Sequence, residues 1–339
     1  MEYTQLGHSD LSVSRICMGC MGFGDPANGQ HSWTVGESQT RKIIRYALEK
    51  CLQFIQQINL RTMKKVFLGL LLAVVSVSAK AQTTEKTDDM DRIELCKKNY
   101  TTLFGGEALN DEGTDPEIMD ILQKYIFGEV FRTGELDIKT REMITCVCLA
   151  TMQQLPQLKG HAGAALNVGV TPIELREAIY QCAPIIGFPK VLNALGAVNE
   201  AFKERGIKVP LESQATVTEE NRYEKGHEIQ YSLYGDRTKE ALKDVPGGMG
   251  EKVARFLTEV HFGDFQTRSG LDTPTRELLT YCVLTVIGAE PQLHSHLLAN
   301  LKAGNSPEKI TAAVIQCMPY IGFPAALKAL MIIKDETMQ

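Results

Sequence analysis

The sequence has little that would mark a nucleic-acid-binding, membrane-spanning or metal-binding protein. Its formal charge of −5 over 339 residues is mild, so a strongly basic surface is not expected. The nine cysteines form no paired C-x-x-C knuckles of the zinc type, and the one C-x-x-C is Cys17-Met18-Gly19-Cys20. With 44% hydrophobic and 23% charged residues, the composition indicates an ordinary globular protein. We expect no metal and no nucleic-acid partner.

One apolar run is conspicuous but too short to span a bilayer, which takes about 20 residues. Residues 61–86 read RTMKKVFLGLLLAVVSVSAKAQTTEK: a basic start, an apolar run to Ala79, and a small-x-small site before Gln82. This layout predicts a signal peptide over residues 63–81. Cleavage at Ala81-Gln82 would give a periplasmic or secreted protein with no remaining membrane contact. If residues 1–62 are retained, a cytoplasmic or membrane-tethered protein is expected.

Residues 1–62 precede this predicted signal. Their opening has the short alternating runs of a hairpin followed by a strand, and residues 38–50 have helical spacing. The pattern Y-x-x-L-G-x-S-x-L-x-V-S-x-I-x-x-G-x-M-G-F-G resembles the amino terminus of aldo/keto reductases. That family's first catalytic aspartate is matched by Gln56. Because one βα unit cannot close a (β/α)₈ barrel, we expect a short, non-autonomous α/β remnant without reductase activity.

A gapless internal repeat occupies most of the remaining chain. The segments starting at Leu136 and Leu271 match with a constant offset of 135, from R-E-M-I-T and R-E-L-L-T to the shared G-F-P. We predict two tandem modules, residues 90–210 and 220–336, joined by a polar linker at about 208–222.

The local signals in both modules are helical. Thr171-Pro172-Ile173-Glu174 is a capping box, and Ser306-Pro307 repeats its start. Asp115-Pro116 and Thr273-Pro274 should open two more helices, while Gly169 and Gly304 fall where helix C-caps are expected. No strand pattern follows residue 90. Each module should contain five or six helices around an apolar centre.

Each module carries one glutamate and one histidine that a helical hairpin would bring together. Glu142 precedes His161 by 19 residues, and Glu277 precedes His296 by the same spacing. A carboxylate beside an imidazole makes a general base or a proton relay, although a buried structural hydrogen bond gives the same pattern. Gln157 and Gln292 stand one turn before the histidines and could bind a ligand's carboxylate or carbonyl.

The combined motifs resemble the carboxymuconolactone decarboxylase family, which includes the alkylhydroperoxidase D-like proteins. The motifs are R-E-[ML]-[IL]-T, the histidine 19 residues after the glutamate, A-L-N-x-G-x-T-P-x-E-[IL] and G-F-P-x-x-L-x-A-L. The resemblance implies an all-α fold of two tandem helical-bundle modules and subunits that form trimers or hexamers. We expect a homo-oligomer, a dimer or trimer. Two chemistries occur in the family: cofactor-free decarboxylation of a carboxylated lactone and thiol peroxidation with a C-x-x-C.

The residues that precede each histidine favour the first chemistry. In the redox branch, cysteines lie seven and four residues before the histidine, where this chain has Gln154 and Gln157, then Ala289 and Gln292. The remaining thiols, Cys146 among them, are expected in the core.

The leading hypothesis is a cofactor-independent enzyme that acts on a small acidic or lactone-like molecule, with His161 and His296 as acid/base and Glu142 and Glu277 orienting them. The alternatives are a peroxidase or disulfide reductase that uses a thiol such as Cys146, and a non-catalytic binding or assembly protein. Lys159 precedes His161 where His294 precedes His296. This predicts that the first module binds acidic ligands better and that His161→Ala is the more damaging change.

Overall fold

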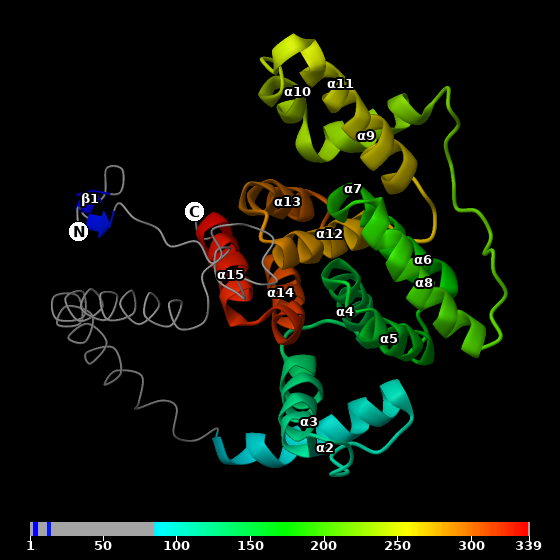
Figure 1. The fold of residues 1–339 in the computed structure, drawn as a ribbon, viewed down its shortest axis with the longest axis vertical. Helices are drawn as coiled ribbons and strands as arrows, with labels where there is room; N and C mark the ends of the chain where they lie inside the picture. Colours follow the sequence, from blue (N-terminus) through cyan, green and yellow to red (C-terminus); the bar gives the residue numbers. More distant parts are fainter. Residues whose placement is uncertain (1–2, 6–11, 15–84, 338–339) are drawn as a thin grey trace, which may run out of the picture. The chain divides into compact units, whose positions relative to one another are not determined.

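The computed structural model describes residues 3–5, 12–14 and 85–337 (Figure 1). The chain divides into two units, Met1–Glu85 and Lys86–Gln339. In the first, β1 (Tyr3–Gln5) pairs antiparallel with β2 (Ser12–Ser14), which is the hairpin predicted from the opening pattern. The predicted signal peptide at 63–81 and the rest of the remnant at 1–62 lie outside the described residues.

The second unit is all-α from residue 85 to residue 337, as predicted, and two of its segments are π-helical. Its first half contains α2 (Glu85–Phe104), α3 (Pro116–Gln123), the π-helix η2 (Lys124–Glu129), the 3₁₀ turn η3 (Val130–Arg132), α4 (Ile138–Met152), α5 (Leu155–Asn167), α6 (Pro172–Tyr180), α7 (Ala183–Ile186) and α8 (Phe188–Glu204).

The second half follows an extended connection. It contains α9 (Arg222–Tyr234), α10 (Arg237–Ala241), the 3₁₀ turn η4 (Pro246–Gly248), α11 (Met249–Phe256), the π-helix η5 (Leu257–Gln266), α12 (Thr273–Ile287), α13 (Glu290–Lys302), α14 (Pro307–Ile321) and α15 (Phe323–Thr337). The bounds of α12 and α13 are those of α4 and α5 shifted by the repeat offset. Among the described residues, no helix is long and apolar enough to cross a membrane.

The helices begin and end where the sequence signals predicted. Thr171 and Glu174 form a complete capping box at α6, and the Ser306 side chain caps α14. The strongest matched pair is Asp137 and Asp272, whose carboxylates accept from the third residue of α4 and of α12 at 2.9 Å. These caps fix the first turn of the two helices that carry the glutamates.

The two modules share one apolar core, which corrects the expectation of a separate centre in each. Helix α4 packs against both α12 and α14, so the central layer is built from both halves of the repeat. Ile144 and Val147 of α4 and Leu279 and Val283 of α12 are fully buried in one continuous cluster. Packing between modules therefore positions groups of one module beside the glutamate of the other.

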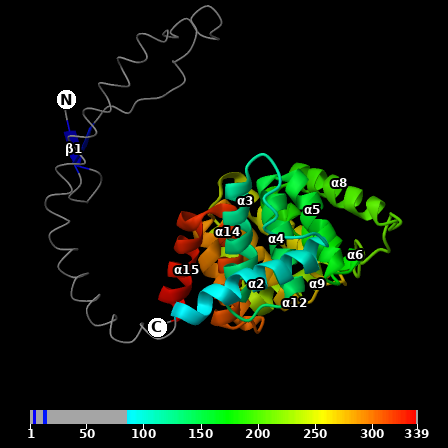
Figure 2. The same ribbon diagram turned by 90° about the horizontal axis from the view of Figure 1, so that it is seen from below.

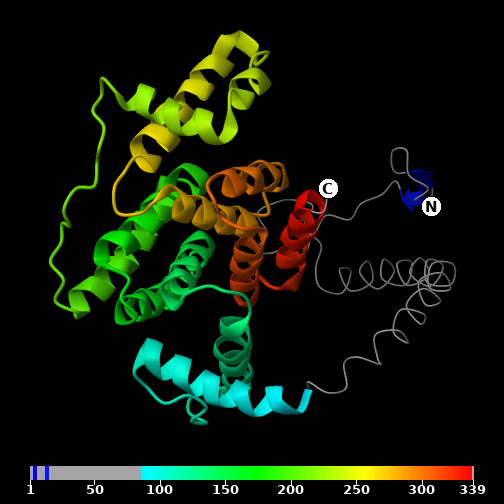
Figure 3. The same cartoon turned by 180° about the vertical axis from the view of Figure 1, so that it is seen from behind.

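The amino-terminal helices of each module lie at opposite ends of this central layer. In Figure 1, α2 and α3 lie at one end, α9 to α11 at the other, and α4, α12 and α14 between them. The view from behind in Figure 3 shows the same order, and the view from below in Figure 2 looks onto α2.

Candidate active site

The first glutamate-histidine pair joins α4 to α5. His161 Nδ1 lies 2.8 Å from Glu142 Oε2, and the Glu142 side chain is fully buried whereas 14% of His161 remains exposed. Since a carboxylate only accepts, Nδ1 carries a proton, and in the neutral imidazole Nε2 then keeps its lone pair. Nε2 makes no hydrogen bond to a described residue. The predicted pair is therefore present, with one ring nitrogen available to a ligand.

Two aromatic rings from different modules enclose His161. Phe104 at the end of α2 meets the imidazole edge to face at 5.4 Å between ring centroids, and Tyr320 of α14 does so at 6.0 Å. The Tyr320 hydroxyl accepts a hydrogen bond from Thr145 Oγ1 at 3.2 Å. Burial, followed by the Glu142 charge, raises the pKa of Tyr320 well above its usual value, so the phenol stays protonated. The first site is thus completed by the second module.

The second pair has the same backbone placement but a different neighbour. His296 Nδ1 lies 3.1 Å from Glu277 Oε2, again with a fully buried carboxylate. The Tyr234 hydroxyl of α9 donates to Glu277 Oε2 at 2.6 Å and lies 2.6 Å from His296 Nδ1. The Tyr234 hydroxyl therefore contacts both partners of the second pair. Among the described residues, no hydroxyl bridges Glu142 and His161 in this way.

A further histidine is buried beside the second pair only. His261 of η5 is 5% exposed and meets Phe262 edge to face at 4.7 Å. Burial, followed by the proximity of His296, lowers the pKa of His261 to about 4, and the Glu277 charge opposes that shift. The matching residue of the first module is Ile126. The second site thus contains a neutral imidazole at the position where the first site has the aliphatic side chain of isoleucine.

A buried arginine before each glutamate anchors the loop that leads into its helix. Arg141 donates to the carbonyls of Val130, Thr133 and Gly134 and to Gln316 Oε1, all at 2.9–3.1 Å. Without a carboxylate partner, desolvation lowers the pKa of Arg141 to about 10, which the Asp137 charge partly opposes. The guanidinium thereby fixes the loop ahead of α4, and with it the position of Glu142.

Arg276 makes the matching loop contacts, donating to the carbonyls of Arg268 and Ser269 at 2.9 and 3.1 Å. Unlike Arg141, it also lies 3.4 Å from a buried carboxylate, Glu177 of the first module. The two glutamates are therefore held in place by related but electrically different networks.

The predicted ligand-binding glutamines do not join the pairs. Gln157 and Gln292 are exposed, and no side-chain hydrogen bond of either is found among the described contacts. Lys159 turns toward α8, where it pairs with Glu204 at 2.6 Å and Glu200 at 3.4 Å. Its charge is therefore compensated away from the histidine, which removes the reason given for stronger anion binding in the first module.

The thiols lie where the sequence placed them, in the core. All six cysteines of the described unit are free and buried. Burial, followed by the Glu142 charge, raises the pKa of Cys146 well above its usual value, so the thiolate is disfavoured. Cys148 Sγ and Cys317 Sγ lie 3.5 Å apart between the modules. No group of three or more potential metal ligands occurs among the described residues.

Four aromatic neighbours of the histidines were missed from the sequence: Phe104, Tyr234, His261 and Tyr320. Tyr320 breaks the gapless repeat at Ile185, and His261 matches Ile126 at the same offset just before the repeat begins, so a search for unequal matched positions would have found them. Phe104 and Tyr234 lie before the gapless repeat, and they correspond only once the structure places both against a histidine.

Comparison with known proteins identifies the family of the two modules. The sequence profile described as "Carboxymuconolactone decarboxylase family" matches residues 116–200 and again 251–335. The 4-carboxymuconolactone decarboxylase of Acinetobacter baylyi is 25% identical over 119 residues, which are 35% of this chain and 89% of that protein. An uncharacterized 15.0 kDa protein of Paracoccus denitrificans is 41% identical over 78 residues, 22% of this chain and 58% of that protein.

Among solved structures, a chain described as a gamma-carboxymuconolactone decarboxylase subunit from Burkholderia xenovorans aligns with a TM-score of 0.43 and 20% identity. The alignment covers 73% of this chain and 98% of that one.

Proposed function

Because the chain belongs to the carboxymuconolactone decarboxylase family, we propose that it is a cofactor-independent acid-base enzyme acting on a small carboxylated or lactone-like molecule. His161 is the principal acid/base, and Glu142 orients it. His296 and Glu277 form a second site with the same components. The name of the Acinetobacter baylyi relative supports a carboxy-lyase reaction as the first to test.

The observation that carries this proposal is the 2.8 Å contact between His161 Nδ1 and the fully buried Glu142 carboxylate. Glu142 Oε1 is buried and has no hydrogen-bond partner among the described residues. A buried carboxylate with an unsatisfied oxygen is costly unless it serves a positive partner. Protonation of His161 supplies that partner.

The geometry supports a proton relay in which Glu142 keeps the Nδ1 proton and Nε2 exchanges a proton with the substrate. Loss of carbon dioxide leaves an electron pair on carbon, and protonated Nε2 can deliver a proton to it. Glu142 stabilises the imidazolium during that cycle. General acid-base groups of this kind contribute about 10²- to 10⁴-fold to rate.

The thiol alternative has weaker support. Cys146 is fully buried and its pKa is raised, whereas a reactive cysteine needs exposure and a lowered pKa. The non-catalytic alternative differs from our proposal in one measurable respect, because a binding protein would not turn its ligand over.

The test is an assay of 4-carboxymuconolactone decarboxylation. It measures the disappearance of the carboxylated lactone and the release of carbon dioxide. We expect turnover by the unmodified protein and its loss in the double variant His161→Ala/His296→Ala. As a matched control, His227→Ala removes a half-exposed histidine of α9 that contacts neither pair. If no carboxylated lactone is turned over but one still binds, the protein is a binding protein and the proposal fails.

Three untested expectations accompany this proposal. We propose that the protein is exported after cleavage at Ala81-Gln82, that it forms a homo-oligomer, a dimer or trimer, and that Gln157 and Gln292 contact substrate. Mass spectrometry of the mature amino terminus and light scattering would test the first two. Substitution of each glutamine by alanine, with KM as the readout, would test the third.

A further inference from the structure

A half-open cleft of about 600 Å³ lies away from both histidines, where the linker meets the first module. Its walls come from α6, α8, residues 209–213 and the loop before α12. Arg176 and Arg268 supply charge, Tyr180 supplies a ring, and Leu195, Val209 and Leu211 supply apolar surface. The proposed reaction uses none of these residues.

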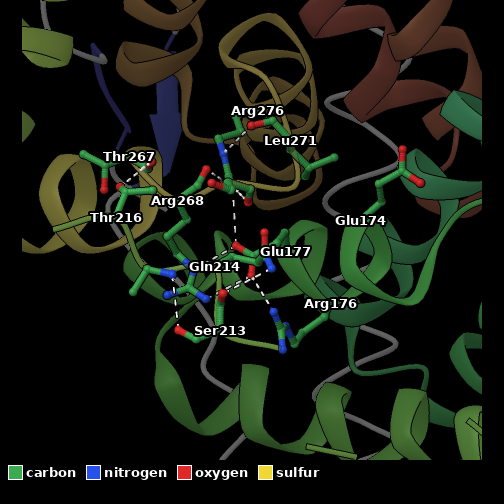
Figure 4. A network of polar contacts seen from close by, with 12 residues as sticks. Glu174, Arg176, Glu177, Ser213, Gln214, Thr216, Thr267, Arg268, Leu271 and Arg276 are labelled. Atoms are coloured by element: carbon green, nitrogen blue, oxygen red, sulfur yellow. Dashed lines mark hydrogen bonds and ion pairs between the residues drawn. The ribbon is translucent and has the colours of Figure 1, made fainter. Parts of the chain in front are cut away.

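The cleft is positively charged because three guanidiniums share one carboxylate. Arg268 holds Glu177 with two hydrogen bonds, at 2.8 and 3.0 Å, and Arg276 approaches the same carboxylate at 3.4 Å (Figure 4). Arg176 adds a third contact at 3.3 Å. The charge of Asp272 offsets part of the positive charge of Arg276. The Glu212 side chain is exposed to solvent. Glu177 thus leaves positive charge uncompensated at the base of the cleft.

Among the side chains that line the cleft, Arg176 has unused hydrogen-bonding capacity. It is 8% exposed, and its Nη2 donates to the Glu212 carbonyl at 2.7 Å. Its Nε is buried and has no partner among the described residues. A guanidinium buried to this extent normally has its donors paired, because an unpaired buried donor is destabilising. An anion in the cleft would give this guanidinium, which lines the cleft, a further partner.

The aromatic and apolar walls indicate what kind of anion fits. Arg176 and Arg268 each lie over the Tyr180 ring, at 5.4 and 5.3 Å from its centroid, which holds the two guanidiniums on one ring. The cleft then continues into aliphatic surface from α8 and the linker. A bare inorganic anion would leave that surface in water, whereas an organic acid would cover it.

We infer that this cleft binds a small organic carboxylate, with the carboxylate on Arg176 and Arg268 and its apolar body against Leu195 and the linker. The second module lacks such a site. Its residues matching Arg176, Glu177 and Tyr180 are Thr311, Ala312 and Ile315. Within the described modules, residues 85–337, this site therefore occurs once, although the module is duplicated.

The first experiment measures benzoate binding to the full chain by calorimetry and saturation-transfer NMR, with neutral benzamide as the matched probe. We expect benzoate to bind and benzamide to bind at least about tenfold more weakly, since hydrogen bonds to charged groups are worth about 1.5–3 kcal/mol. Equal binding of the two probes would overturn the inference. Equal displacement of benzoate by inorganic phosphate would also overturn it, because the apolar walls would then contribute nothing.

The second experiment locates the bound benzoate. Arg176→Gln leaves Arg268 and Arg276 on Glu177, and Asn199→Trp fills the cleft from an exposed position of α8. Each should weaken benzoate binding about tenfold or more. Arg255→Gln, the same chemical change on an exposed arginine of α11, should leave it unchanged.

The double variant His161→Ala/His296→Ala separates this cleft from the proposed active sites. We expect it to retain benzoate binding at the strength of the unmodified protein. Two results would show that the cleft is not the site. One is loss of benzoate binding in the double variant, and the other is unchanged benzoate binding in an Arg176→Gln variant that has a native melting temperature. Either result leaves the decarboxylation assay as a separate test of the proposed function.

Discussion

The two glutamate-histidine pairs have the same helices beneath them and different rings above them. Phe104 covers His161 and Tyr234 covers His296, and each ring comes from the first helix of its own module. Only the tyrosine carries a hydroxyl, and it donates to Glu277. A single oxygen atom therefore separates an exclusive carboxylate-imidazole contact from a shared one. Duplication copied the relay, and its surroundings then diverged.

The same divergence occurs beneath the glutamates. Among the described residues, Arg141 is hydrogen-bonded to no carboxylate and relies on carbonyl and amide oxygens, whereas Arg276 and Arg268 depend on Glu177. The first module thus supplies the charge that anchors the second.

Replacing Glu177 should have the largest effect on stability. Glu177→Leu leaves Arg268 and Arg276 without their buried carboxylate, and breaking a buried ion pair in this way costs about 3–5 kcal/mol. Denaturant unfolding measures it. Glu174→Gln is the matched control on the same helix, where the carboxylate is partly exposed and pairs with Lys139, and it should cost about 1 kcal/mol or less. Similar losses in both variants would show that the charge network is not a stabilising anchor.

His261 predicts a pH dependence that the first module lacks. Its pKa is lowered from 6.5 to about 4, so the unfolded chain binds a proton in this range that the folded chain excludes. The free energy of unfolding therefore keeps the contribution of His261 above pH 6.5. It loses that contribution, by up to about 3 kcal/mol, as the pH falls toward 4. His261→Ile installs the side chain type of Ile126. Between pH 7 and pH 4, the free energy of unfolding should fall less steeply for the variant than for the unmodified protein. Equal slopes would contradict the assignment.

Tyr234→Phe gives the second site the ring of the first. Removing the hydroxyl leaves Glu277 to orient His296 alone, as Glu142 orients His161. In a His161→Ala background, we expect the added change to raise the residual turnover several-fold, at a stability cost of about 1 kcal/mol. The reciprocal change, Phe104→Tyr, should lower turnover of the first site. A residual rate that Tyr234→Phe leaves unchanged would mean that the hydroxyl does not restrain the second site.

Lys159→Gln should have the smallest effect. Its ammonium pairs with two exposed carboxylates of α8, and such solvent-screened surface pairs contribute little to stability. We expect KM for an acidic substrate to stay unchanged, because this charge is compensated away from the histidine. A clear rise in KM would restore the electrostatic asymmetry predicted from the sequence.

Much of the fold followed from local sequence signals. The capping box at Thr171 and the cap at Ser306 fix helix starts through hydrogen bonds within four residues, which the sequence shows directly. The spacing of Glu142 and His161 along the chain likewise predicted that they lie on facing helices of a hairpin. These features depend on neighbours in the chain.

What could not be predicted depends on neighbours in space. Tyr320 reaches His161 only because α14 of the second module packs against α4 of the first. Phe104 and Tyr234 lie in helices that precede the repeat, so no constant offset relates them. Arg268 finds Glu177 across 91 residues. The Tyr320 and Arg268 contacts require packing between the modules, which no periodicity in one module reveals.

The most direct test of the account is the kinetic comparison of His161→Ala with His296→Ala on 4-carboxymuconolactone. The exclusive contact of His161 with Glu142 predicts a loss of about 10²- to 10⁴-fold in kcat/KM for the first variant. The shared second site predicts a loss of about tenfold or less for the other. Equal losses would contradict the difference between the modules, and no loss in either would contradict the catalytic role of both histidines.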